Sequence, residues 1–114
     1  MLIKSNLSIP YDRLAEFCRR RQIAEPALFG SVLHDDFRPD SDVDVLVTFS
    51  PAAHWSLFES IDMQDEIQGI FGREVDFVEH ESIESGPNYI RRKHILQNIE
   101  IIYKNKVVYA WMNI

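Results

Sequence analysis

The apolar positions of the chain follow helical spacing in three stretches, and each stretch predicts a helix. The first stretch covers residues 8–18 and opens with a serine and a proline that are typical of a helix start. The second covers residues 56–71, with glycines near its end. The third runs over residues 87–104. We therefore expect three helices.

Three other stretches favour strands. Residues 26–29 form a short apolar run that ends at a glycine, and residues 43–49 and 74–78 alternate between apolar and polar positions. In the 43–49 segment, Val43, Val45 and Val47 fall on one face and Asp44 and Leu46 on the other. The order helix, strand, strand, helix, strand, helix predicts an α/β (α+β) domain whose short mixed sheet is flanked by helices. The length of 114 residues fits one domain over 1–114.

Composition narrows the class of protein. Twelve Lys and Arg against 18 Asp and Glu give a net charge of −6, which argues against direct binding of nucleic acid. The single cysteine, Cys18, excludes an intramolecular disulfide framework and suits a cytoplasmic protein. No apolar run approaches the roughly 20 residues that span a bilayer, and the first residues lack a signal-peptide core, so we expect no membrane partner.

Basic residues cluster at 19–21 and 91–93, each in a stretch expected to be helical. A solvated helix face is the favoured interpretation of both triplets. The alternatives are a docking patch for an acidic partner or a clamp on phosphates.

Asp42 and Asp44, at the start of the 43–49 strand, are the first candidates for chemistry. Residues two apart on a strand project to the same side with Cα atoms roughly 6.5 Å apart, so their carboxylates can share metal ions. Two bare carboxylates beside apolar residues would repel each other and lose hydration, and a divalent cation removes both costs. Oxygen ligands favour Mg²⁺ or Mn²⁺ over zinc. Asp76, in the 74–78 strand, joins them if the two strands are adjacent.

The Gly30-Ser31 step follows the 26–29 strand and is a candidate anion site. Glycine lets the backbone turn sharply and come close to a ligand. If a short helix begins at or just after Ser31, its free N–H groups and the Ser31 hydroxyl offer donors to a phosphate. Phosphates here and metal ions on the aspartates are the two halves of a phosphoryl- or nucleotidyl-transfer centre, in which two metal ions about 3.5–4 Å apart stabilise the attacking and leaving oxygens.

Each piece also has a purely structural interpretation. A glycine after a strand is more often a plain turn than a phosphate site. Asp42 alone could cap a turn, and the Asp-Val-Asp alternation could be protective charge on an edge strand. An EF-hand loop starting at Asp40 fails because Val45 stands where that loop needs glycine. The four histidines lack ligand spacing, and Ser31 lacks a histidine–acid relay in sequence.

Taken together, these pieces resemble the DNA polymerase β-type nucleotidyltransferase superfamily. The resemblance rests on Gly30-Ser31, ten intervening residues, then Asp42-Val43-Asp44, and a later Val75-Asp76-Phe77. More narrowly, the chain is similar to the minimal nucleotidyltransferases, small proteins encoded beside HEPN-domain toxins. The stretches 38–47, 72–78 and 89–96 are typical of that group, and the resemblance extends from the first helix to about Tyr103.

The resemblance implies a function for each site residue. Gly30 and Ser31 would hold the nucleotide phosphates, and Asp42 and Asp44 would bind two Mg²⁺ ions, for which Mn²⁺ can substitute. Asp76 would complete the metal site and accept a proton from the attacking hydroxyl. The transferred group is expected to be AMP from ATP, and in the antitoxin branch the acceptor is a tyrosine of a HEPN ribonuclease toxin, which is thereby silenced.

One segment departs from the family pattern. His34-Asp35 stands where these proteins commonly carry arginine followed by glycine, and the change removes a permanent cation and adds an anion. Two other functions compete with protein adenylylation. One is a non-catalytic antitoxin that masks its toxin sterically. The other is a small-molecule nucleotidyltransferase, which usually needs an additional helical domain.

The C-terminal segment 107–114 is apolar and follows the end of the resemblance. It either packs on the domain's own core or forms an interface. We predict that Tyr109, Trp111 and Met112 contribute to contact with the toxin or to self-association.

Overall fold

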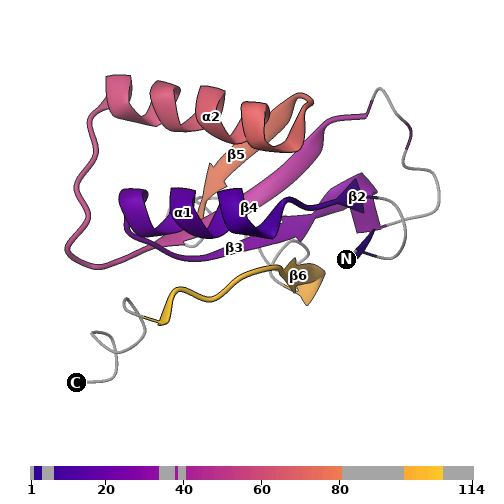
Figure 1. Cartoon of the computed structure of the whole chain (residues 1–114), viewed down its shortest axis with the longest axis horizontal. Helices are drawn as coiled ribbons and strands as arrows, with labels where there is room; N and C mark the ends of the chain where they lie inside the picture. The colour runs from indigo at the N-terminus through magenta and orange to yellow at the C-terminus, as the bar shows by residue number, and fades with distance from the viewer. Residues whose placement is uncertain (1, 4–6, 34–37, 39–40, 81–96, 107–114) are drawn as a thin grey trace.

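The computed structural model describes residues 2–3, 7–33, 38, 41–80 and 97–106 (Figure 1). The elements in this part of the chain are β1 (Leu2–Ile3), β2 (Leu7–Ser8), α1 (Tyr11–Arg21), β3 (Ile23–Phe29), the 3-10 helix η1 (Gly30–Leu33), β4 (Val43–Phe49), α2 (Leu57–Phe71), β5 (Val75–Glu79) and β6 (Ile99–Ile101).

Four strands form one mixed sheet in the order β5-β4-β3-β6. β3 is antiparallel to both of its neighbours, β4 and β6. β4 and β5 are parallel, and α2 makes the crossover between them. β1 and β2 pair separately as a two-stranded sheet. The expected α+β class with a short mixed sheet is confirmed.

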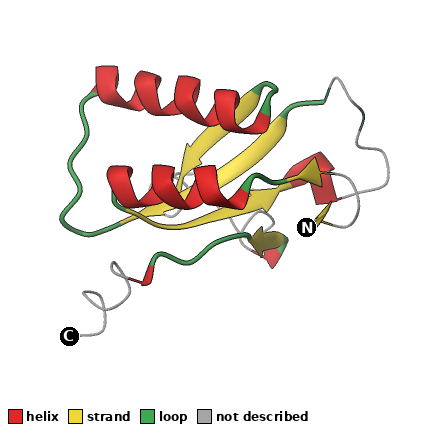
Figure 2. Cartoon of the chain, in the orientation of Figure 1, coloured by secondary structure: helices red, strands yellow, loops and turns green. Residues whose placement is uncertain are grey.

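Both helices lie on the same face of the sheet (Figure 2). Leu14, Phe17 and Cys18 from α1 and Met63, Ile67 and Ile70 from α2 belong to one buried cluster with the inward valines of β4, which are Val43, Val45 and Val47. Leu46 points to the opposite face, where it is buried with Ala27 and Phe29. The alternation predicted for β4 is therefore confirmed, and it orients Asp44 away from the helix-covered core.

The first helix begins later than the sequence predicts. Ser8 was expected near the start of α1, but it lies in β2, where it pairs with Leu2, and α1 begins at Tyr11 after Pro10. Pro10 suits this place because its fixed φ and missing N–H cost nothing ahead of the first turn. The start of α2 agrees with the sequence: Ser56 and Glu59 form a capping box.

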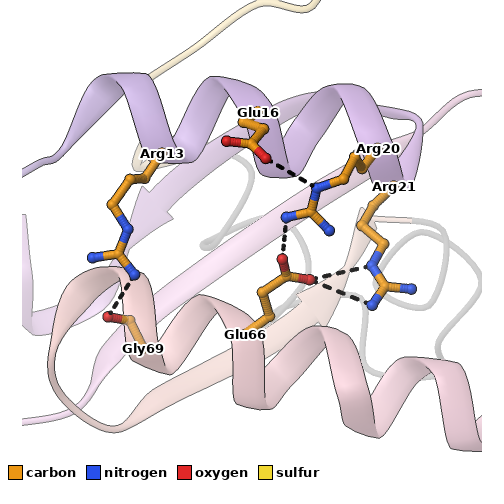
Figure 3. Close-up of polar contacts among 6 residues, drawn as sticks. All are labelled: Arg13, Glu16, Arg20, Arg21, Glu66 and Gly69. Carbon is orange, nitrogen blue, oxygen red and sulfur yellow. Dashed lines mark hydrogen bonds and ion pairs between the residues drawn. The ribbon is translucent and has the colours of Figure 1, made fainter.

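α1 and α2 are tied together by ion pairs (Figure 3). Arg20 donates to Glu66, and the Arg21 Nη2 atom lies 3.4 Å from Glu66 Oε1. Burial raises the pKa of Glu66, but the hydrogen bonds and charges of the two arginines outweigh burial and hold the pKa below its ordinary value. Arg13 also donates to the carbonyl oxygen of Gly69 at 3.4 Å. The basic triplet 19–21 thus lies on a helix as expected, but two of its arginines bind within the molecule.

The prediction of a helix over residues 87–104 is wrong for its C-terminal part, and residues 87–96 lie outside the described part of the chain. Residues 99–101 form β6, which pairs with β3 through Phe29↔Ile99 and Ala27↔Ile101. The backbone N–H of Ile102 then donates to Pro26 O at 3.1 Å, and the N–H of Asn105 to Ala24 O at 2.8 Å. The edge of β3 offers hydrogen-bond partners to this segment, which carries the β-branched Ile99 and Ile101, and this tertiary pairing overrides the helical spacing. Within the described residues, no helix combines the length and the apolar character needed to cross a membrane.

Candidate functional site

Asp44 and Asp76 lie side by side at the start of the parallel strands. They are register partners on β4 and β5, so their side chains project from the same face of the sheet. The backbone N–H of Val43 donates to Glu74 O at 2.9 Å, and this hydrogen bond fixes the register one residue before the pair. Asp76 is exposed and Asp44 is half-buried. The sequence predicted that Asp76 would join the other aspartates only if the two strands were adjacent, and β4 and β5 are adjacent.

Gly30 brings the turn after β3 against the carboxylate of Asp44. Phe29 is the register partner of Asp44, so Gly30 directly follows the residue beside the aspartate. Gly30 has a φ of +77°, and a Cβ built on it would meet the carboxylate of Asp44. Both the positive φ and the close approach require glycine here. The sequence made the anion site conditional on a short helix that begins at or just after Ser31; the 3-10 helix η1 begins one residue earlier, at Gly30, and the Ser31 side chain is half-buried in it.

Asp42 is exposed and precedes β4 by one residue, and two hydrogen bonds join Arg38 and Ser41 just before it. The N–H of Arg38 donates to Ser41 Oγ and the N–H of Ser41 donates to Arg38 O, each at 3.0 Å. Arg73, which leads into β5, donates from Nη2 to Arg38 O at 3.1 Å. These bonds connect the segments that carry Asp42 and Asp76.

Two glutamines that the sequence pattern did not mark as site residues hold the start of β5. Gln68 Oε1 accepts the backbone N–H of Val75 at 3.2 Å, and Gln64 Nε2 donates to Val75 O at 3.3 Å. Both come from α2, one turn apart, and they satisfy the backbone of the residue just before Asp76. The signal in the sequence was a pair of glutamines at i, i+4 on the helix that precedes an aspartate-bearing strand.

The donor chemistry at this edge fits a hard divalent cation. Carboxylate oxygens from Asp42, Asp44 and Asp76 are ligands that Mg²⁺ and Mn²⁺ prefer. In the described part of the chain, however, no three His, Cys, Asp or Glu side chains are arranged as a metal-holding group. The structure therefore unites Asp44 and Asp76 beside Gly30, while a site that also includes Asp42 stays a prediction.

Several predicted features lie outside the described residues. They are the departure at His34-Asp35, the basic triplet 91–93 and the apolar segment 107–114.

A cleft of about 520 Å³ lies at the other end of β4 and β5 from the aspartates. Its lining includes Phe49, His54, Trp55, Glu79 and His80. At about 3.3 Å per strand residue, Phe49 stands on the order of 16 Å from Asp44 along β4. His54 and His80, which show no ligand spacing in the sequence, thus line one cleft. This cleft is distinct from the site of the aspartates.

Comparison with known proteins gives a family and a fold. The family model described as "Nucleotidyltransferase domain" matches residues 12–109. A protein adenylyltransferase, MntA, from Thermococcus cleftensis is 34% identical over 71 residues, which are 62% of this chain and 70% of that protein.

Solved structures give the same fold. A structure of a proposed minimal nucleotidyltransferase superposes with a TM-score of 0.60 at 27% identity, over 90% of this chain and 96% of that one. An MNT antitoxin in complex with a tri-AMPylated HEPN toxin from Shewanella oneidensis superposes with a TM-score of 0.54 at 14% identity, over 83% and 70% of the two chains.

Proposed function

The chain belongs to the nucleotidyltransferase domain family, and from this premise we propose that it is a protein adenylyltransferase antitoxin. It transfers AMP from ATP to a tyrosine of a HEPN ribonuclease toxin and so neutralises the toxin. The observation that carries the proposal is the placement of Asp44 and Asp76 at one register position beside Gly30. The likeness to a protein adenylyltransferase and to an MNT antitoxin solved with an AMPylated HEPN toxin supports the acceptor class.

In the proposed reaction, the tyrosine oxygen forms a bond to the α-phosphorus of ATP, the bond to pyrophosphate breaks, and pyrophosphate leaves. Gly30 and Ser31 hold the phosphates, because the turn at Gly30 brings backbone close to the site and the Ser31 hydroxyl donates. Asp76, exposed at the edge of the site, accepts the phenolic proton. A tyrosine with a pKa near 10 needs such a base to react at pH 7.

Mg²⁺ is the cofactor in this proposal, with Asp42, Asp44 and Asp76 as its ligands. Two such ions would stabilise the charge on the attacking and leaving oxygens. The AMP group adds negative charge to the toxin, which repels the phosphates of an RNA substrate. This repulsion is the physical basis of neutralisation.

The experiment that tests the proposal is intact-mass measurement. The purified chain is mixed with the HEPN protein encoded beside it, ATP and Mg²⁺, and the HEPN protein should gain mass in whole AMP units. Replacing ATP by GTP, CTP or UTP in parallel reactions identifies the base preference. A complex that neutralises the ribonuclease without any gain in mass would favour the non-catalytic masking alternative.

A further inference from the structure

α2 carries large apolar side chains on the face that points away from the core. Leu57 is 75% exposed, Phe58 is 79% exposed and Ile61 is 51% exposed. Helical spacing places Ile61 one turn beyond Leu57 and Phe58, so the three side chains form one surface. We call Leu57, Phe58 and Ile61 the α2 patch.

The opposite face of the same helix is already satisfied. Met63 and Ile67 are fully buried and Ile70 is 7% exposed, all in the core cluster. α2 is therefore apolar on two faces, which is typical of a helix that is covered on both sides. The outward positions of α1 are charged instead, and they include Asp12, Arg13, Glu16 and Arg19.

A capping box fixes the backbone of the turn that carries Leu57 and Phe58. The Ser56 hydroxyl accepts the N–H of Glu59 at 3.2 Å, and the Glu59 carboxylate accepts the N–H of Ser56 at 3.1 Å. The backbone N–H of Ser56 also holds the pKa of Glu59 below its ordinary value, so this end of the capping box stays ionised. The cap fixes the first turn, where Leu57 and Phe58 stand, so a partner would meet a prearranged surface.

Charge around the α2 patch restricts the occupant. Residues 57–71 contain four acidic residues and no lysine or arginine. Arginines of α1 bind Glu66, whereas Asp62 and Asp65 are exposed next to the α2 patch. Two copies meeting through this face would place acids against acids. A partner with an apolar groove rimmed by lysine or arginine is complementary to it.

We infer that the α2 patch and its rim of Asp62 and Asp65 form the docking surface for the ribonuclease toxin. This inference rests on the proposed function. A ribonuclease has to bind RNA phosphates and so presents basic surface, which is the charge that the rim requires. The first turn of α2 follows the end of β4, whereas Asp44 stands near its start. The α2 patch and the site that carries Asp44 therefore lie in separate parts of the domain.

The test compares binding and transfer in variants of the full chain with the HEPN protein encoded beside it. L57A/F58A should raise the Kd and the KM for that protein at least tenfold and leave kcat at saturation within twofold. D62K/D65K should weaken binding several-fold and reduce its dependence on salt. I101A, which shortens a 41% exposed isoleucine on β6, is the matched control and should bind as wild type does.

Unchanged Kd and KM in L57A/F58A would overturn the inference. Sedimentation that shows a wild-type dimer and a monomeric L57A/F58A, with unchanged binding of the HEPN protein, would also overturn it and assign the α2 patch to a second copy. If wild type binds through the α2 patch but adds no AMP, docking is supported and the transferase proposal fails. The two failures are therefore distinguishable.

Discussion

The carboxylate of Asp44 occupies the space into which a side chain at Gly30 would project. The turn after β3 and the Asp44 carboxylate on β4 are thus so close that residue 30 has no room for a methyl group. Any residue other than glycine must displace either the turn or the carboxylate.

Gly30→Ala should disrupt both stability and transfer. The positive φ costs about 1–3 kcal/mol for a residue with a Cβ, and the contact with Asp44 adds to that cost. Urea unfolding and AMP transfer measure the two effects. Gly69→Ala is the control: a Cβ there has nothing within 4 Å, and a helix interior gains about 0.5–1 kcal/mol from alanine. Equal stability of the two variants would show that Gly30 does not need its conformation.

Asp44→Asn and Asp76→Asn should each reduce AMP transfer by at least about 100-fold, because a ligand or base is lost. Asp76→Asn should also raise the free energy of unfolding by about 0.2–1 kcal/mol, since like charges at paired strand positions repel. An AMP-transfer assay checks the loss of activity, and thermal unfolding checks the gain in stability. Asp12→Asn, at an exposed site in the first turn of α1, should change transfer by less than twofold. Full activity in the Asp76 variant would remove its role as a base.

Gln68→Leu should loosen the start of β5. The substitution takes away the acceptor of the Val75 N–H, and an unsatisfied buried N–H costs about 1–3 kcal/mol. Hydrogen exchange at the Val75 amide should accelerate, and AMP transfer should fall because Asp76 follows directly. Gln68→Glu keeps an acceptor oxygen and should restore slow exchange. If the leucine variant exchanges as slowly as wild type, the glutamine does not position β5.

The Glu66 ion pairs should contribute to stability in a pH-dependent way. Since the pKa of Glu66 is lower in the folded protein than its ordinary 4.5, the contribution is complete above that value and is lost as pH falls through the folded pKa. Glu66→Gln should reduce the free energy of unfolding at pH 7 by about 0.5–1 kcal/mol. The difference from wild type should shrink progressively as pH falls below 4.5. A difference that persists unchanged at pH 3 would contradict an electrostatic origin.

Cys18 should be inert in the native protein. Burial raises the pKa of its thiol to about 12, so little thiolate forms at pH 8, and the side chain is fully buried. A thiol reagent such as DTNB should react only after the protein is unfolded in guanidinium chloride. Rapid reaction in buffer would reveal opening of the α1 face of the core.

The parts of the fold that the sequence predicted are those where burial and periodicity agree. β4 carries its valines inward and its aspartate outward, so pattern and environment give one answer for Val43–Phe49. Residues 99–101 show the opposite case. Their helical spacing is weak next to the hydrogen bonds that the edge of β3 supplies, and that edge is far away in sequence.

The candidate site likewise has a part that the sequence predicted and a part that it did not. The residue types and their order identified Gly30, Asp44 and Asp76, because glycine and paired acids are unusual beside buried strands. Their register could not be obtained from spacing alone, since it depends on how α2 returns the chain to β4. The contributions of Gln64 and Gln68 depend on the same return.

The crossover through α2 has a consequence for the order of assembly. Asp44 is synthesised well before Asp76, and the two meet only when β5 has docked on β4 across the completed helix. A chain in which β5 has not docked on β4 has both carboxylates but not their pairing. A ligand that requires both therefore recognises the native state alone, and its concentration will set how far the melting temperature rises.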